Sequence, residues 1–161
     1  MTTPTLVTAD NRFLEYEVAL TVEAGAYSAG DLVCAKITLE NIVSAAKRNA
    51  VVLRDVLIHD NANQSTVDYD VVFFDADPSG TTFTLNSALD VADTDIAKVC
   101  GLAQVTVSAI MSDNCFLAAT PGIRLVPSAG TSLYAAIIAR TNAPTYAATT
   151  DLSIRLLFER A

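Results

Sequence analysis

A chain of 161 residues is long enough for one domain that buries roughly 70% of its unfolded surface, so neither disulfides nor metals are needed for folding. Hydrophobic residues make up 52% of the chain and charged residues only 17%, below the roughly 25% of an average soluble domain. The formal net charge of −8 argues against a nucleic-acid binder, which needs clustered Lys and Arg, because Lys47-Arg48 is the only basic run.

The shortage of charge has two interpretations. The cores of protein interfaces are depleted in charged residues, which favours a surface that meets other subunits. The alternative is an Ala- and Val-rich core inside a compact monomer. Composition alone leaves both open, and we favour the first.

The first segment, residues 1–12, carries Pro4 and several threonines without sustained periodicity, which predicts an extended N-terminal arm. It has neither the basic region nor the apolar region of a secretory signal. The apolar runs of the chain are also shorter than the roughly 18 residues that span a bilayer. We therefore expect a protein that is made in the cytoplasm and has no membrane partner.

From Phe13 onward the sequence alternates between apolar and polar residues, which is typical of half-buried strands. One apolar face is expected over residues 13–22, formed by Leu14, Tyr16, Val18, Leu20 and Val22. The next one-sided strand is expected over Val33–Leu39, after the turn at residues 28–30.

Two strongly hydrophobic runs follow. Val51–Ile58 is apolar on both faces apart from Arg54 and Asp55, which is typical of a strand covered on both sides. We expect it to be central in its sheet, or covered on one face by a partner. Val67–Phe74 comes after the turn-forming residues 60–65 and has one apolar face. We expect these two runs to form a strand pair at the centre of the fold.

Residues 75–98 are the least strand-like part of the chain and are called the excursion below. They contain Pro78, Gly80 and several aspartates, and Asp93–Val99 is the single helical candidate. Connections of this length inside a compact domain are usually functional.

Five more strands are expected beyond the excursion, over Ala103–Ala109, Cys115–Ala119, Ile123–Val126, Leu133–Ala139 and Ile154–Phe158. Eight or nine strands with almost no helix predict an all-β fold, and the uneven loops favour a two-sheet β-sandwich of jelly-roll or Greek-key type with one short helix. The expected organisation is the arm over residues 1–12 and a single sandwich domain over residues 13–161.

The sequence contains little that resembles catalytic chemistry. A Ser-His-Asp or Cys-His mechanism would have to use His59, the only histidine, but no nucleophile or orienting group can be identified beside it. Nucleotide-binding glycine loops of the G-x-x-x-x-G-K-[ST] and G-x-G-x-x-G types are missing from the sequence. We expect a protein that is not an enzyme and that uses no cofactor.

Metal binding is also not expected. Asp75–Gly80 begins like a calcium loop, but the twelfth position is Asn86 rather than Glu, which favours an ordinary turn. The three cysteines lie in hydrophobic contexts without CxxC spacing, which predicts buried free thiols at Cys34, Cys100 and Cys115.

Four stretches carry a resemblance to a known family: AYSAGDLV (26–33), VLRDVLIHDNANQ (52–64), VDYDVVFFDADPSG (67–80) and TTFTLNSALDVADTDIAKVCGLAQV (81–105). Over these stretches the chain resembles the head decoration, or cement, proteins of tailed bacteriophages. The resemblance implies a β-sandwich subunit that assembles as dimers or trimers over joints between major capsid subunits. It implies no individual functional residue, because the family is not defined by an active site.

The resulting hypothesis is a structural protein of the virion that binds the outside of the capsid shell and bridges neighbouring subunits. Its expected partners are the major capsid protein and further copies of itself. We expect the contacts on the arm and on the excursion, at Thr3, Pro4, Leu6, Asp75, Asp77, Pro78, Phe83 and Leu85.

Two alternatives come from other functional classes. A carbohydrate- or receptor-binding module of a phage fibre would share the sandwich, although the chain has no Trp to stack on a sugar ring. A β-sandwich hydrolase would need His59 in a cleft beside a nucleophile.

Overall fold

The computed structural model describes residues 4–9, 12–44, 50–141 and 144–160. Almost all of the regular structure in these residues is β, and the one helical element among them is the single-turn 3₁₀ helix η1. The strands are β1 (Thr5–Ala9), β2 (Phe13–Leu20), β3 (Gly25–Ala26), β4 (Ile37–Leu39), β5 (Val51–Asp60), β6 (Asp68–Phe74), β7 (Val99–Val105), β8 (Val107–Met111), β9 (Asn114–Ala119), β10 (Ile123–Leu125), β11 (Leu133–Thr141), β12 (Thr145–Tyr146) and β13 (Leu152–Arg160); η1 is Ile96–Lys98.

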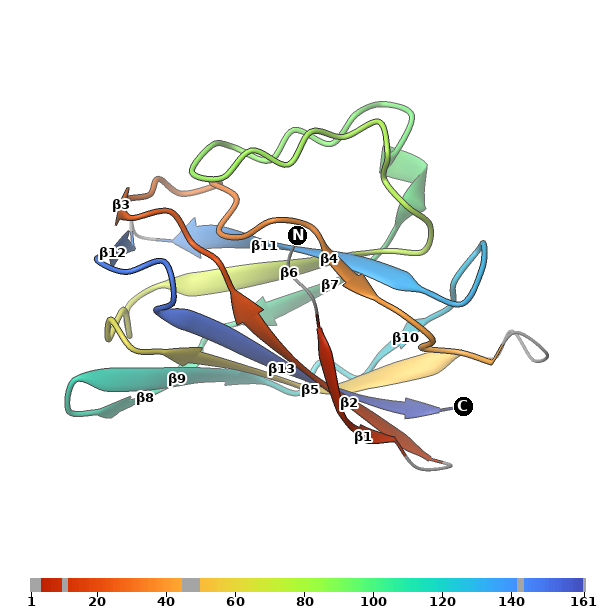
Figure 1. Ribbon diagram of the computed structural model, residues 1–161, viewed down its shortest axis with the longest axis horizontal. Coiled ribbons are helices and arrows are strands. Elements are labelled where there is room, and N and C mark those ends of the chain that lie inside the picture. The colour runs from red at the N-terminus through yellow and green to blue at the C-terminus, as the bar shows by residue number, and fades with distance from the viewer. Residues whose placement is uncertain (1–3, 10–11, 45–49, 142–143, 161) are drawn as a thin grey trace.

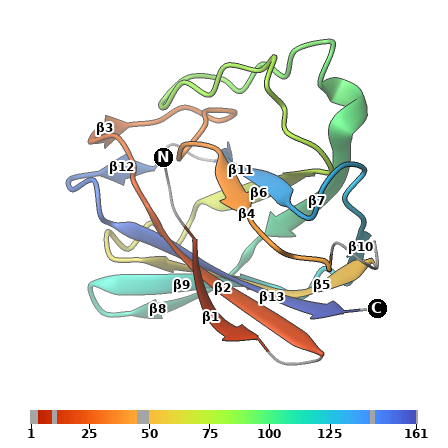
Figure 2. The same ribbon diagram turned by 45° about the vertical axis from the view of Figure 1, so that its right-hand side comes forward.

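Two antiparallel sheets face each other (Figures 1 and 2). The larger sheet has seven strands in the order β1-β2-β13-β5-β9-β8, with β10 also paired to β5. The smaller sheet has four strands in the order β4-β11-β6-β7, and β12 and β3 form a short separate ribbon. The prediction of an all-β fold is confirmed, and the arrangement is consistent with a sandwich.

The core lies between the two sheets and is built from the inward-facing residues of each strand. In β2 the predicted apolar face, Leu14 to Leu20, is buried as expected, and Val22 beyond it is also buried. Phe158 of β13 is fully buried, and its ring meets the rings of Tyr16 and Phe73 edge-on, with centroids 6.1 Å and 6.4 Å away. Phe73 belongs to the opposite sheet, so this aromatic group joins the two layers.

The prediction that the two hydrophobic runs pair with each other is wrong. β5 lies in the seven-stranded sheet and β6 in the four-stranded sheet, so they belong to opposite layers. The chain crosses between the layers at Asp60, which is fully buried and accepts hydrogen bonds from the backbone N–H groups of Ala62 and Gln64, at 2.7 Å and 3.2 Å. The turn that suggested a hairpin is therefore a connection between sheets.

The central position predicted for β5 in its sheet is confirmed, but within this chain only one of its faces is buried. Its register against β13 shifts where Leu157 faces Asp55 and Phe158 faces Leu53, which leaves Arg54 as an extra, bulged residue. A bulge adds one residue to the strand and shifts the in-and-out alternation of its side chains by one position. Odd-numbered residues before it and even-numbered residues after it therefore point to the same side of the sheet. Val51 and Leu53 before the bulge and Val56 and Ile58 after it all face the core; Arg54 and Asp55 are exposed.

Three other predicted elements differ from the structure. The strand expected over Ala103–Ala109 is divided at Thr106 into β7 and β8, which belong to different sheets. Over Val33–Leu39 only β4 is a strand, preceded by isolated bridges at Asp31 and Leu32. The helical candidate Asp93–Val99 shrinks to the single turn of η1.

The remaining strand predictions are confirmed with small changes of boundary, as β9, β10, β11 and β13. Within the predicted arm, Thr5–Ala9 forms β1 and pairs antiparallel with β2 at one edge of the large sheet. Cys34 and Cys115 are buried free thiols, as predicted, and Cys100 is a half-buried free thiol. Burial raises the pKa of the Cys34 thiol to about 12.

Candidate interaction surface

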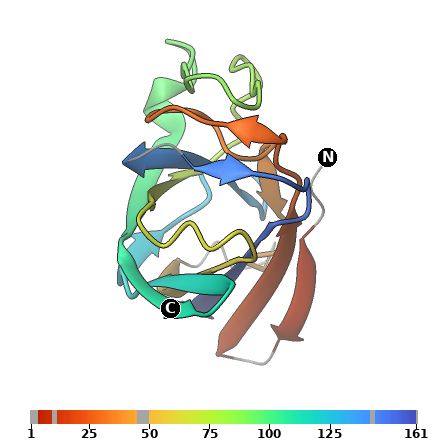
Figure 3. The same cartoon turned by 90° about the vertical axis from the view of Figure 1, so that its left-hand side faces the viewer.

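The two sheets differ in what covers their outer faces. The excursion lies across the outer face of the four-stranded sheet, seen at the top of Figures 1 and 3. Phe74, Leu32 and Ala136 form a second buried cluster beneath it, and the excursion residues Phe83, Leu89 and Val91 pack against that cluster. Within the described residues no comparable segment lies over the outer face of the seven-stranded sheet.

A buried carboxylate links the two ends of the excursion through hydrogen bonds. Asp95 is only 1% exposed; it accepts a hydrogen bond from Thr81 Oγ1 at 2.8 Å and pairs with Lys98 Nζ at 2.7 Å. Lys98 also donates to the backbone carbonyl of Asp77 at 2.7 Å. The hydrogen bond from Lys98 is the main reason that the pKa of Asp95 lies below its ordinary value. The conformation of the excursion is thus stabilised by hydrogen bonds and an ion pair among its own residues.

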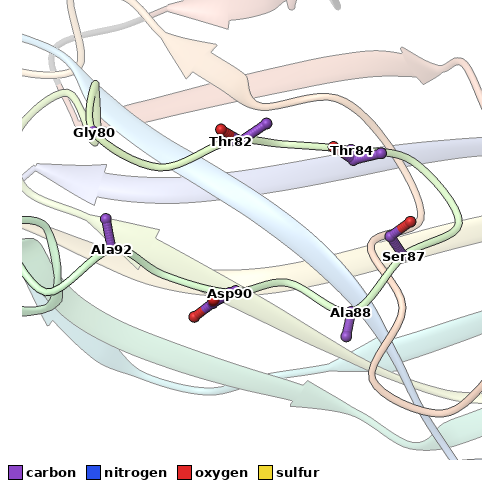
Figure 4. A pocket seen from close by; sticks show the side chains of 7 residues that line it. All are labelled: Gly80, Thr82, Thr84, Ser87, Ala88, Asp90 and Ala92. Carbon is purple, nitrogen blue, oxygen red and sulfur yellow. The ribbon is translucent and has the colours of Figure 1, made fainter.

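A polar pocket of about 380 Å³ lies between the outgoing and returning segments of the excursion. Figure 4 shows Gly80, Thr82 and Thr84 along the outgoing segment and Ser87, Ala88, Asp90 and Ala92 along the returning one. The lining offers hydroxyl groups and one carboxylate but contains no aromatic or basic residue. These groups suit a small neutral, hydroxyl-bearing ligand better than an anion.

The structure does not bring the predicted contact residues together. Thr3 lies outside the described residues, Pro4 is half-buried, and Leu6 is 47% exposed on β1, in the seven-stranded sheet. The other five belong to the excursion, on the far side of the other sheet (Figures 1 and 3): Asp75, Asp77, Pro78, Phe83 and Leu85.

Several of these excursion residues are engaged within the chain. Pro78 is buried, and Asp75 and Leu85 are half-buried. Phe83 is half-buried against Phe74, with ring centroids 6.3 Å apart. Asp77 is exposed and forms an ion pair with Lys36. On the excursion, Asp77 therefore remains the most accessible of the predicted contacts.

The outer face of the seven-stranded sheet divides into a charged half and an apolar half. On β13 and β2, Arg155 lies 3.3 Å from Glu17 and 3.6 Å from Glu15, so that half carries ion pairs. Toward the other edge, the register places Val107 beside Ala118 and Leu57, and Ala109 beside Phe116 and His59. We call the set Leu57, Val107, Ala109, Met111, Phe116 and Ala118 the apolar half-face.

The apolar half-face ends at the edge strand β8. Val107 is 68% exposed and Met111 is 61% exposed on the outer side, and Ile110 is 64% exposed on the other side of the strand. Edge strands usually carry charged residues that prevent association, but the run from Val99 to Ser112 contains none. This uncharged run is visible in the sequence and is the local signal of an open edge that the overall shortage of charge only suggests.

A second pocket, of about 290 Å³, opens within the apolar half-face and is lined by Leu57, His59, Asn61, Met111, Asn114, Cys115 and Phe116. The Oγ atom of Ser153 lies 3.4 Å from Nδ1 of His59, a long contact between paired residues of β13 and β5. A hydrolytic triad also needs a carboxylate that orients the imidazole, and no such hydrogen bond to His59 is found in the part of the chain that the structure describes. The pocket is suited to receive an apolar side chain.

The chain matches no protein-family model and no curated protein sequence. Within the described residues there is also no group of three or more His, Cys, Asp or Glu side chains that could hold a metal ion. None of the described helical structure is long and apolar enough to cross a bilayer.

Proposed function

We propose that the protein is a capsid decoration protein of a tailed bacteriophage, which binds the outside of the major capsid shell and stabilises it by bridging subunits. The observation that carries this proposal is the uncovered apolar half-face, presented by a sandwich whose other outer face is closed by the excursion. The resemblance of residues 26–33, 52–64 and 67–105 to decoration proteins supports it. We also propose the jelly-roll or Greek-key type as the finer description of the fold.

The physical basis is buried area on a rigid support. Monomeric soluble proteins rarely expose large contiguous apolar patches, and a large exposed patch usually marks an interaction site. Because the sheet already orders the backbone, binding at this face costs little backbone conformational entropy. No reactive step is required, so the proposed role is structural and not enzymatic, and the proposed location is the surface of the virion.

The arm and the excursion remain predicted secondary contacts. Leu6 and Val7 are each 47% exposed on β1, at the opposite edge of the large sheet from β8, and Asp77 is exposed on the excursion. Contacts at both edges of one sheet would allow a single subunit to touch two neighbours in the shell.

Mass spectrometry of purified particles from the phage that encodes this chain tests the role. A decoration protein would be present in copy numbers comparable to those of the major capsid protein. A few copies per particle would instead indicate a fibre or tail component, and no copies would contradict a role in the virion.

Co-sedimentation with shells of the cognate capsid protein tests the surface. Leu57→Glu places a charge in the apolar half-face and should reduce shell occupancy, whereas Ala19→Glu, on the outer face of β2, should leave occupancy unchanged. Equal occupancy for the two variants would remove the apolar half-face from the proposal.

The fibre-module alternative is supported by one observation, the hydroxyl-lined pocket of the excursion. Such a module would bind neutral glycans, and substitution of Asp90 by Ala would weaken that binding. Glycan-array binding that is lost in Asp90→Ala would favour this alternative over shell binding.

A further inference from the structure

The edge strand β8 offers an ordered set of backbone groups for pairing. β8 and β9 are joined by the two residues Ser112 and Asp113, and their register is regular from Met111↔Asn114 to Val107↔Ala118. In such a hairpin the residues next to the turn form a hydrogen-bonded pair, and hydrogen-bonded pairs then alternate along the ladder. The N–H and C=O groups of Ser108 and Ile110 therefore point away from β9, toward the open edge.

The hairpin is held in place by the rest of the chain. Asn63 Nδ2 donates to the carbonyl oxygen of Ser112 at 3.0 Å, and Ser108 Oγ donates to the carbonyl oxygen of Ser65 at 3.0 Å. Ser108 lies opposite the buried Leu117, so its hydrogen bond is on the side of β8 away from the apolar half-face. No strand in residues 4–9, 12–44, 50–141 and 144–160 pairs with the open side of β8.

The charge distribution indicates which strand this edge accepts. Two copies of a chain with net charge −8 repel each other over most of their surfaces. The fourteen-residue run from Val99 to Ser112 carries no charge, so two copies can approach along this strand without repulsion between like charges on it. Antiparallel pairing about a two-fold axis is also self-complementary: where residue i of one copy meets residue j of the other, residue j of the first copy meets residue i of the second.

We propose that two copies of this chain associate through β8, antiparallel about a two-fold axis at Ala109, to form one continuous sheet. In this register Ser108 of each copy faces Ile110 of the other, which pairs all of the outward backbone groups of these two residues. Val107 faces Met111 of the other copy, so these two exposed apolar side chains cover one another. The inference goes beyond shell binding and does not depend on it.

Sedimentation velocity of the purified chain tests the proposal without any capsid protein present. The wild type should sediment as a dimer. Ala109→Lys brings two ammonium groups together at the axis and should raise the dissociation constant about a hundredfold or more, because like charges placed opposite each other strongly oppose association. Ala19→Lys, an equal change on the exposed outer face of β2, should leave the dimer intact.

Ala109→Cys gives a second measurement that does not rely on disruption. Residue 109 would face its own copy at a non-hydrogen-bonded position, where Cα atoms are about 4.5 Å apart and close enough for a disulfide. Mild oxidation should yield a cross-linked dimer in Ala109→Cys but not in Ala19→Cys or the wild type. A monomeric wild type, or a dimer that neither Ala109→Lys weakens nor Ala109→Cys cross-links, would overturn the proposal and leave the shell-binding test unaffected.

Discussion

Removal of the Phe158 ring is the most direct test of how the two sheets are held together. The side chain is fully buried in β13 and contacts the rings of Tyr16 in its own sheet and Phe73 in the opposite sheet. Truncation of a buried Phe to Ala costs about 3–5 kcal/mol, because apolar contacts are lost and a cavity remains. For a chain of this size about 1 kcal/mol corresponds to roughly 2–4 °C, so Phe158→Ala should lower the melting temperature by roughly 6–20 °C.

The matched control is Phe116→Ala, the same change on the half-buried outer face of β9. Unfolding in urea, followed by far-UV circular dichroism, gives the free energy of unfolding for both variants. Phe158→Ala should be clearly the more destabilised of the two. Equal losses would mean that the core does not lie where the structure places it.

A double-mutant cycle of Phe158→Leu and Phe73→Leu then tests the contact between the layers. Edge-to-face aromatic pairs are worth about 0.5–1.5 kcal/mol beyond their buried area, so the coupling energy should fall in that range. A coupling energy indistinguishable from zero would contradict the placement of β6 and β13 in opposing sheets.

Three other outcomes follow from single residues. Asp60→Ala leaves two backbone donors of the turn without their acceptor and should cost about 1–3 kcal/mol in urea unfolding, whereas Asp60→Asn keeps one acceptor oxygen and should cost less. Gly101→Ala would place a Cβ 2.7 Å from the side chain of the buried Leu125, so overpacking should cost about 1–3 kcal/mol, and no loss would refute the close approach of β7 to β10. The pKa of the Asp95 carboxyl is lowered in the folded state, so its contribution to stability is complete above the ordinary carboxyl pKa of about 3.9 and is lost as the pH falls through the folded pKa. Asp95→Asn lacks this titrating group. Between about pH 5 and pH 2.5 the variant should therefore lose less stability than the wild type, as measured by thermal unfolding.

Much of the fold could be predicted because most strands bury one face in regular alternation. Where the alternation failed, a local feature was responsible. In β5 the bulge at Arg54 placed apolar residues at both odd and even positions, and this resembles a strand covered on both sides. At Thr106 the alternation continues from β7 into β8 although the chain changes sheets, and nothing in the residue pattern marks that change.

The candidate surface was harder to predict than the fold. Low charge directed attention to surfaces rather than to reactive groups, and length and irregularity directed the expected contacts to the arm and the excursion. In the structure Pro78 is buried, and Phe83 packs against the outer face of the four-stranded sheet. Val107 and Met111 look like ordinary strand residues in the sequence, and they are exposed only because β8 is the last strand of its sheet.

The two proposals reinforce each other through geometry. Pairing of two β8 strands would continue the apolar half-face of one copy into that of the other, since Val107 and Met111 lie on the same side as Phe116. The two apolar half-faces would form one continuous surface, and each copy's β1, with exposed Leu6, would lie at a far end of the joined sheet. A subunit with two equivalent binding surfaces gains affinity through effective concentration once the first surface is bound. Ala109 is itself part of the apolar half-face, so Ala109→Lys should lower shell occupancy in two ways, by placing a charge on that surface and by preventing pairing. Only the loss that comes from pairing should depend on protein concentration, being larger at low concentration than at high concentration, where monomers still pair.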